Sequence, residues 1–279
     1  MRVPSVLKSI LLLSLVLLAV AGCKREAAVQ PAPGQPEAPA MADPAASAAV
    51  VPVLKDVIET TDAYVVGISY PPVVNKYPGL AREIAAYTDA ARAELMQAVA
   101  GFGNDKPSAP YELSLAFEQI LDSPQLVAIA ADGSRYTGGA HGEPLVARFV
   151  WLPAENRLLT ANALVPKVEG WAAIAGYVRE QLHTSVSVRA DADEMPPEER
   201  LQFVRNADKM IDEGTEADID NFSQFQPVVG ADGKVTAVRF VFPPYQVGPY
   251  ADGTQTVDVP ASVLLPHVAP EYAGLFARN

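Results

Sequence analysis

The spacing of apolar residues changes from segment to segment in this chain, and that change constrains the fold more than any other feature. In residues 64–70, apolar side chains occupy every second position, which is the pattern of a strand with one buried face. In residues 80–99 they recur every three or four positions, which predicts an amphipathic helix. Strand and helix patterns follow one another in mixed order, without a regular βαβ rhythm. We therefore predict an α+β fold rather than a doubly wound parallel sheet.

The remaining elements are predicted from the same two patterns. Two helices are expected, at 167–182 and from Pro197 to Gly214, and the second should bury Leu201, Val204 and Ile211. Asp132-Gly133 is expected to end a strand, and Asp232-Gly233 to form a turn before one. Further strands are predicted at 111–118, 126–130, 145–151, 235–242 and 254–259. These elements are expected to form two small subdomains with mixed or antiparallel sheets and packed helices, at 51–150 and 151–279.

The first residues carry the pattern of an export signal. Arg2 and Lys8 precede an apolar run over 10–21, which ends in small residues just before Cys23. The run is short for a membrane span, which needs about 20 apolar residues, and it matches a secretory signal instead. Cys23 is the only cysteine in the chain, so no disulfide within the chain explains it. We predict a lipoprotein signal peptide at 1–22 and a lipid on Cys23. The alternative is an ordinary signal peptide followed by an unrelated cysteine.

Residues 23–50 are rich in alanine and proline and hold few large apolar side chains. Such a segment cannot offset the entropy of ordering, so we expect a disordered linker that acts as a semi-stiff spacer. Residue 24 is lysine rather than aspartate. By resemblance to lipoprotein sorting in Gram-negative envelopes, this implies the outer membrane, with the folded part facing the periplasm. The membrane is thus an expected partner, through the lipid on Cys23.

The formal net charge of −12 becomes −14 once the two bases of the signal peptide are removed. Such a surface repels phosphates, so a nucleic-acid partner is not expected. The charge is compatible with a basic partner protein, and it is equally compatible with solubility alone.

Two stretches resemble a known domain family. Residues 136–142, Tyr-Thr-Gly-Gly-Ala-His-Gly, resemble the motif that closes the first half of a two-part extracytoplasmic domain of unknown function. Residues 242–253, Phe-Pro-Pro-Tyr-Gln-Val-Gly-Pro-Tyr-Ala-Asp-Gly, resemble the motif near the end of its second half, and residues 158–164 resemble a short segment between the two. The domain pair occurs in the ectodomain of the anti-sigma factor RsiV and ahead of the catalytic domain of the peptidoglycan deacetylase PdaC. The resemblance implies an α+β fold in two subdomains over most of residues 51–270, and it implies lysozyme binding in RsiV-like members.

Four side chains of these motifs are candidate binding residues: Tyr136 and His141 in the first, Tyr245 and Tyr250 in the second. Aromatic side chains in a rigid proline–glycine loop can form a recognition surface, although they can also pack the loop onto its own sheet. His141 stands among glycines, so a tight turn with local hydrogen bonding is the alternative to a ligand role.

Metal and catalytic motifs are not found in the sequence. A zinc site would need His141, His183 and His267 to meet, and their spacing gives no indication of this. The acid-rich stretch 191–220 lacks the register of an EF-hand loop, so a solvated helix face is expected. No nucleophile elbow, phosphate-binding loop or His-Glu-x-x-His motif occurs. We therefore predict no cofactor, no metal and no enzymatic activity.

The predicted function is a lipid-anchored binding module of the cell envelope, with an unknown ligand for which a lysozyme-like protein is the candidate. Two alternatives remain open. One is a structural or assembly lipoprotein of the envelope, and the other is a peptidoglycan-directed hydrolase whose catalytic residues meet only in the fold. The deacetylase activity of PdaC belongs to a catalytic domain that we do not expect in this chain.

Overall fold

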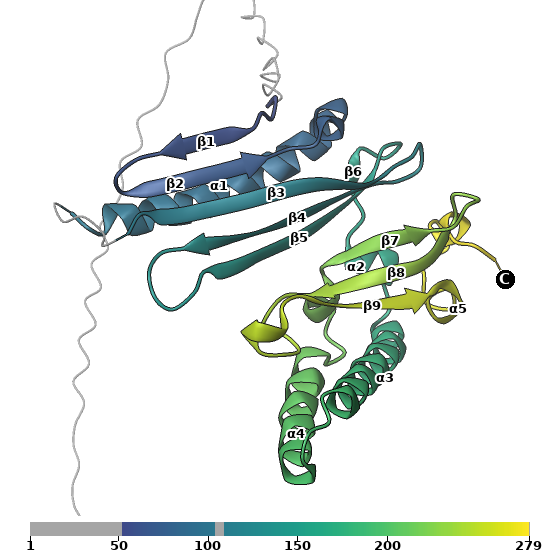
Figure 1. The fold of residues 1–279 in the computed structure, drawn as a ribbon. Coiled ribbons are helices and arrows are strands. Elements are labelled where there is room, and N and C mark those ends of the chain that lie inside the picture. The colour runs from purple at the N-terminus through teal and green to yellow at the C-terminus, as the bar shows by residue number, and fades with distance from the viewer. Residues whose placement is uncertain (1–51, 104–108, 279) are drawn as a thin grey trace, which may run out of the picture. The chain divides into compact units, whose positions relative to one another are not determined.

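The computed structural model describes residues 52–103 and 109–278. Residues 49–279 form one compact unit, in which two sheets and their helices follow one another along the chain (Figure 1). The predicted signal peptide, the linker and Cys23 lie outside the described residues. In the described part of the chain, no helix is both long enough and apolar enough to cross a membrane.

The first half of the described chain is a six-stranded sheet with one long helix on its face. Its strands are β1 (Val57–Thr60), β2 (Tyr64–Ser69), β3 (Tyr111–Asp122), β4 (Val127–Tyr136), β5 (Glu143–Leu152) and β6 (Arg157–Leu158). They lie side by side in sequence order, and neighbours are antiparallel except for β2 and β3. A parallel pair needs a crossover, which η1 (Pro72–Lys76) and α1 (Pro78–Ala100) provide.

Buried apolar side chains hold the helix α1 on the sheet. They are the same residues whose spacing predicted the helix and the strands. Along β3, Leu113, Leu115 and Phe117 are buried, and the residues between them are exposed. Leu80 and Ile84 of α1 are fully buried in the same cluster. Burying a side chain of this size stabilises the fold by about 1.5–3 kcal/mol, so a few such residues fix the helix in place.

The second half consists of helices followed by a small sheet. The helices are α2 (Ala161–Leu164), α3 (Val168–Ala192) and α4 (Pro197–Gly214), and η2 (Ile219–Phe222) leads into the sheet. Within the described chain this sheet has three antiparallel strands in sequence order: β7 (Phe225–Val229), β8 (Val235–Phe242) and β9 (Gln255–Pro260). The short helix η3 (Tyr250–Asp252) lies between β8 and β9, and α5 (Ala261–Leu264) and η4 (Ala273–Leu275) follow.

Each half has its own apolar core, and β5 contributes to both. Trp151 packs in the core beneath α1, whereas its neighbours Val150 and Leu152 pack in the core of the second half. Successive side chains of a strand point to opposite faces, so this one strand joins the two cores. The predicted boundary between residues 150 and 151 falls inside β5.

The predicted α+β class is confirmed by this arrangement of two sheets with packed helices. Both cores are built from residues between Leu54 and Phe276. The unit 49–279 therefore contains the apolar contacts that a domain needs to fold on its own.

Two details of the sequence predictions are wrong for identifiable reasons. β4 does not end at Asp132-Gly133 but continues to Tyr136. A Cβ on residue 133 would lie 1.9 Å from the backbone oxygen of Ser114, so glycine is needed there for close strand contact and not for a turn. Leu201 is 58% exposed, because the buried residues of α4 lie at its C-terminal end.

Candidate functional site

The first candidate motif forms the turn between β4 and β5. Tyr136 ends β4, and its hydroxyl donates to the backbone oxygen of Gly139 at 3.2 Å. Gly138 and Gly139 both have φ of 100°, a region that favours glycine, so the chain can fold back tightly here. This turn presents His141 on its exposed side, shortly before β5 begins.

The second candidate motif forms the connection between β8 and β9, and hydrogen bonds fix its shape. The Tyr245 backbone N–H donates to the backbone oxygen of Gly248 at 2.9 Å. The side-chain amide of Gln246 donates to the backbone oxygens of Gly214 and Asn221, at 3.0 and 2.9 Å. The loop is therefore anchored on the end of α4 and on η2.

The two motifs meet in a cluster of three exposed rings, His141, Tyr245 and Tyr250, which we call the aromatic triad. The Tyr245 hydroxyl and His141 Nε2 are 2.8 Å apart and share a hydrogen bond. The rings of His141 and Tyr250 are stacked, with centroids 4.1 Å apart and planes 12° apart. The Tyr245 ring lies 5.7 Å from that of Tyr250 and 6.0 Å from that of His141. A turn of the first half and a loop of the second thus build one surface.

The aromatic triad faces solvent, although large aromatic side chains are usually mostly buried. Tyr245 is 52% exposed and Tyr250 is 36% exposed. Tyr245 also has φ of 75°, and the left-handed region costs a residue other than glycine about 1–2 kcal/mol. In contrast, Phe242 of the same motif is fully buried and packs edge-on against Phe222. The loop therefore packs one aromatic ring into the core and presents two to solvent.

Tyr136, the fourth candidate residue, lies outside the aromatic triad. Its half-buried ring packs edge-on against Tyr111, with centroids 6.5 Å apart. Because its hydroxyl binds the backbone of the turn, Tyr136 supports the position of His141.

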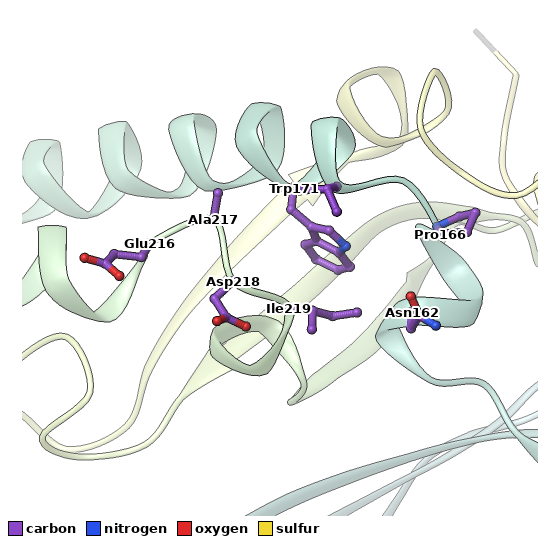
Figure 2. A pocket seen from close by; sticks show the side chains of 8 residues that line it. Asn162, Pro166, Trp171, Glu216, Ala217, Asp218 and Ile219 are labelled. Atoms are coloured by element: carbon purple, nitrogen blue, oxygen red, sulfur yellow. The ribbon is translucent and has the colours of Figure 1, made fainter.

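An open pocket lies between the start of α3 and the segment that joins α4 to η2 (Figure 2). Its volume is about 460 Å³, and Trp171 reaches into it from α3. Asp218 and Ile219 face Trp171 from the opposite side, and Asn162 and Pro166 border one end. We call this the Trp171 pocket. The sequence did not predict it, because its walls come from segments that are far apart in the chain.

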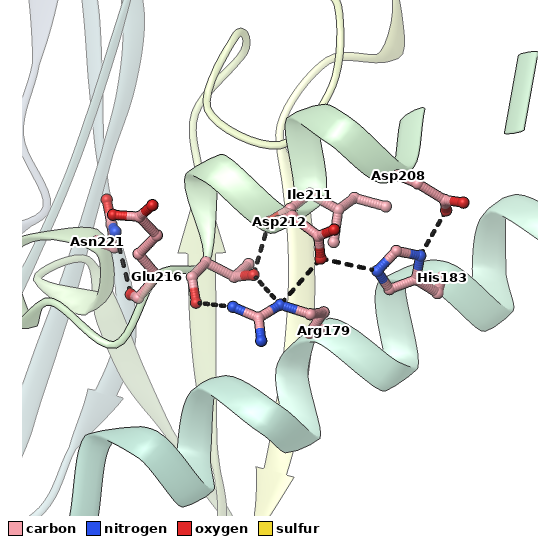
Figure 3. A network of polar contacts seen from close by, with 8 residues as sticks. Arg179, His183, Asp208, Ile211, Asp212, Glu216 and Asn221 are labelled. Carbon is pink, nitrogen blue, oxygen red and sulfur yellow. Dashed lines mark hydrogen bonds and ion pairs between the residues drawn. The ribbon is translucent and has the colours of Figure 1, made fainter. Parts of the chain in front are cut away.

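A polar network joins α3 to α4 (Figure 3). His183 lies between two carboxylates, with Nδ1 2.5 Å from Asp208 and Nε2 3.3 Å from Asp212. The same Asp212 oxygen is 3.1 Å from Nε of Arg179, and Nη2 of Arg179 donates to the backbone oxygen of Thr215 at 3.0 Å. Part of the acid-rich stretch 191–220 therefore holds α4 on α3.

The three histidines lie in separate surroundings. His141 belongs to the aromatic triad, His183 to the network between α3 and α4, and His267 lies beside Gly170 at the start of α3. Among the residues that the structure describes, no group of three or more His, Cys, Asp or Glu side chains is placed to hold a metal ion. The chemistry that the aromatic triad offers is ring stacking and hydrogen bonding.

Comparisons with known proteins agree with the motifs. Residues 58–143 match the family model described as deacetylase PdaC, and residues 165–262 match the model described as a protein of unknown function, DUF3298. The first match includes Tyr136 and His141, and the second includes Tyr245 and Tyr250, so the predicted resemblance to this two-part domain is confirmed. The second description names no activity. A comparison with curated proteins found no match.

Among solved structures, the chain resembles two DUF3298 family proteins. One is from Bacteroides fragilis, with 16% identity and a TM-score of 0.50, and the match covers 79% of this chain and 94% of that one. The other is from Pseudomonas aeruginosa, with 16% identity and a TM-score of 0.50, and the match covers 81% of this chain and 94% of that one. At this identity the likeness shows the fold alone.

Proposed function

We propose that this chain, which carries the PdaC and DUF3298 domains one after the other, is a binding module of the cell envelope and not an enzyme. The aromatic triad is the observation that carries the proposal. Loops from both halves bring three rings together at the surface. Tyr245 keeps its ring half in solvent on a backbone conformation that favours glycine. A strained position of this kind persists where the side chain serves a function, so we assign the aromatic triad to ligand contact.

The proposal includes a lipid anchor on Cys23 and a spacer over residues 23–50. The lone cysteine after a short apolar run supports the anchor, and the alanine and proline content supports the spacer. In a Gram-negative host, Lys24 favours the outer membrane. A spacer of this length lets the module meet ligands away from the bilayer.

As ligand we propose a basic protein of the lysozyme type. The net charge of −14 that remains without residues 1–22 attracts a cationic partner and speeds the encounter. The resemblance of both motifs to the RsiV ectodomain supplies the precedent.

Binding of residues 49–279 to a lysozyme, measured by surface plasmon resonance at low and at physiological salt, tests the proposal. Specific capture should weaken with salt but survive at about 0.15 M, where the Debye length is about 8 Å. The double variant Tyr245→Ala/Tyr250→Ala should bind at least about tenfold more weakly, because truncating central aromatic residues of an interface costs about 2 kcal/mol or more.

Two further variants separate binding from stability. Tyr245→Gly removes the ring but suits φ of 75°, so its free energy of unfolding should equal or exceed that of the wild type while binding is lost. Leu201→Ala removes an exposed apolar side chain of α4 and should leave binding unchanged. Unchanged binding of the double tyrosine variant, or equal binding by an unrelated protein of the same charge, contradicts the proposal.

A further inference from the structure

We propose that the Trp171 pocket takes an arginine side chain of a partner protein. The pocket would then be a second contact surface besides the aromatic triad. The inference rests on the proposed function only in taking the partner to be a protein.

The floor of the Trp171 pocket is rigid and apolar. Trp171 is 3% exposed, and its ring is stacked on Phe222 with centroids 5.6 Å apart. Its indole N–H already donates to the backbone oxygen of Val165 at 3.1 Å, so the indole offers the pocket its apolar edge. Ile219 and the exposed Val168 extend this apolar surface. Such a lining suits an aliphatic chain better than a wholly polar ligand.

Two acidic residues, Glu216 and Asp218, line the same pocket, and in Figure 2 the Asp218 side chain lies opposite Trp171 whereas the Glu216 carboxylate points away from it. Within the described residues, no Lys, Arg or His side chain forms an ion pair with either of them. One Asp218 oxygen accepts the backbone N–H of Asp220 at 3.0 Å, which leaves the other oxygen for a ligand. The partial positive charge at the start of α3 is offset by Glu169 in its first turn. The rim therefore favours a cation.

An arginine side chain has the two properties that this pocket favours, an aliphatic stem and a positive charge. Its aliphatic stem can lie along the apolar floor while its guanidinium remains at the rim. The guanidinium is planar and weakly hydrated, and it can bind carboxylates through paired hydrogen bonds. The lysine ammonium is compact and strongly hydrated, so leaving water for a half-apolar pocket costs it more.

The test is a titration of ¹⁵N-labelled residues 49–279 with Nα-acetyl-arginine methylamide, followed by NMR. The chain has two tryptophans, and Trp151 lies in the other core, so Trp151→Phe assigns the indole signal of Trp171. We expect a saturable shift of that signal and of the Asp218 and Ile219 amides. The citrulline analogue, a neutral isostere, should cause no such shift, and the lysine analogue should bind more weakly.

Matched variants distinguish the site from net charge. Glu216→Gln/Asp218→Asn should weaken binding of the arginine probe by about tenfold or more, because hydrogen bonds to charged groups are the stronger ones. Glu198→Gln/Glu199→Gln removes the same charge at the start of α4 and should leave binding unchanged. Asp218→Asn keeps a side-chain oxygen that can still cap η2, so the fold is expected to persist.

Equal shifts with the arginine and citrulline probes, or no saturable shift of the Trp171 indole, would overturn the proposal. Equal affinity for the lysine probe would overturn the choice of arginine. Because the titration contains no lysozyme, each of these results is distinguishable from a failure of lysozyme binding.

Discussion

Gly214, the last residue of α4, is a position where adding a single methyl group should disturb the aromatic triad. A Cβ on residue 214 would lie 2.0 Å from the backbone oxygen of Gln246 and 2.7 Å from its carbonyl carbon. Gln246 directly follows Tyr245, and its side-chain amide donates to the Gly214 backbone oxygen at 3.0 Å. In Gly214→Ala the loop must therefore move away from α4, and Tyr245 moves with it.

Opposing contributions determine how much Gly214→Ala changes the free energy of unfolding. Alanine is favoured over glycine in a helix by about 1 kcal/mol. Overpacking against neighbouring atoms costs about 1–3 kcal/mol, and here the neighbour is backbone, which cannot rotate away. Loss of the Gln246 hydrogen bond adds about 1 kcal/mol. We expect Gly214→Ala to lower the free energy of unfolding by about 1–3 kcal/mol and to weaken ligand binding at the aromatic triad.

Gly176→Ala is the matched control, because it makes the same chemical change in the middle of α3. A Cβ there would meet no heavy atom within 4 Å, so the variant should gain about 0.5–1 kcal/mol of stability from helix propensity. Urea unfolding of residues 49–279 gives both free energies, and the NMR signals of the His141 ring report movement of the loop. If Gly214→Ala proves as stable as Gly176→Ala, or leaves the His141 signals in place, α4 does not position this loop.

Three further predictions concern other parts of the chain. Metabolic labelling with a palmitate analogue should mark the wild type and miss Cys23→Ser, and equal labelling of both would contradict lipidation. Burial is the largest cause that raises the pKa of Tyr70 and of Tyr87, so the folded state holds these protons more tightly than the unfolded state does. These two tyrosines contribute fully to the free energy of unfolding at a pH below their unfolded pKa of about 10. This contribution is lost as the pH rises through their folded pKa values. Tyr70→Phe/Tyr87→Phe should therefore flatten the fall in unfolding free energy above about pH 10, measured by urea titration, and an unchanged slope would refute the assignment. Asp212→Asn should lower stability by about 1 kcal/mol, because it weakens the contacts of α4 with α3. Its neighbour Glu213, which is exposed, should tolerate Glu213→Gln, and equal stability of both variants would show that the network does not hold α4.

The best predicted strands are those in which apolar and polar residues alternate because one face of the strand is buried. β3 and β8 were predicted because their inward residues are large and apolar. The three strands that were missed are edge strands: β1, the two-residue β6, and β7. β7 contains Pro227, and proline argues against a strand unless the strand lies at an edge. β1 has four residues, and its exposed Ile58 breaks the expected pattern of burial.

The residues of the candidate site were predicted from the sequence, but their arrangement in space was not. The resemblance placed His141 and Tyr245 in two separate motifs, 104 residues apart. Their meeting depends on how the sheets of the two halves pack through β5, and no local pattern records that packing. The Trp171 pocket was missed for the same reason, since Trp171 by itself has the pattern of an ordinary buried helix residue.

The segment 214–221 links the two proposed contact surfaces, yet it leaves them separable by mutation. Gly214 and Asn221 hold the aromatic-triad loop through their backbone oxygens, which accept from Gln246. Between them, Asp218 contributes its carboxylate to the rim of the Trp171 pocket, and the Glu216 backbone oxygen accepts from the Asn221 side chain at 3.1 Å. Replacing the Asp218 carboxylate therefore changes the pocket without removing the Gly214 and Asn221 contacts that hold the loop. Adding a methyl group at Gly214 displaces the loop while the Asp218 carboxylate remains. The same short segment can thus be altered in two ways that test the aromatic triad and the pocket independently.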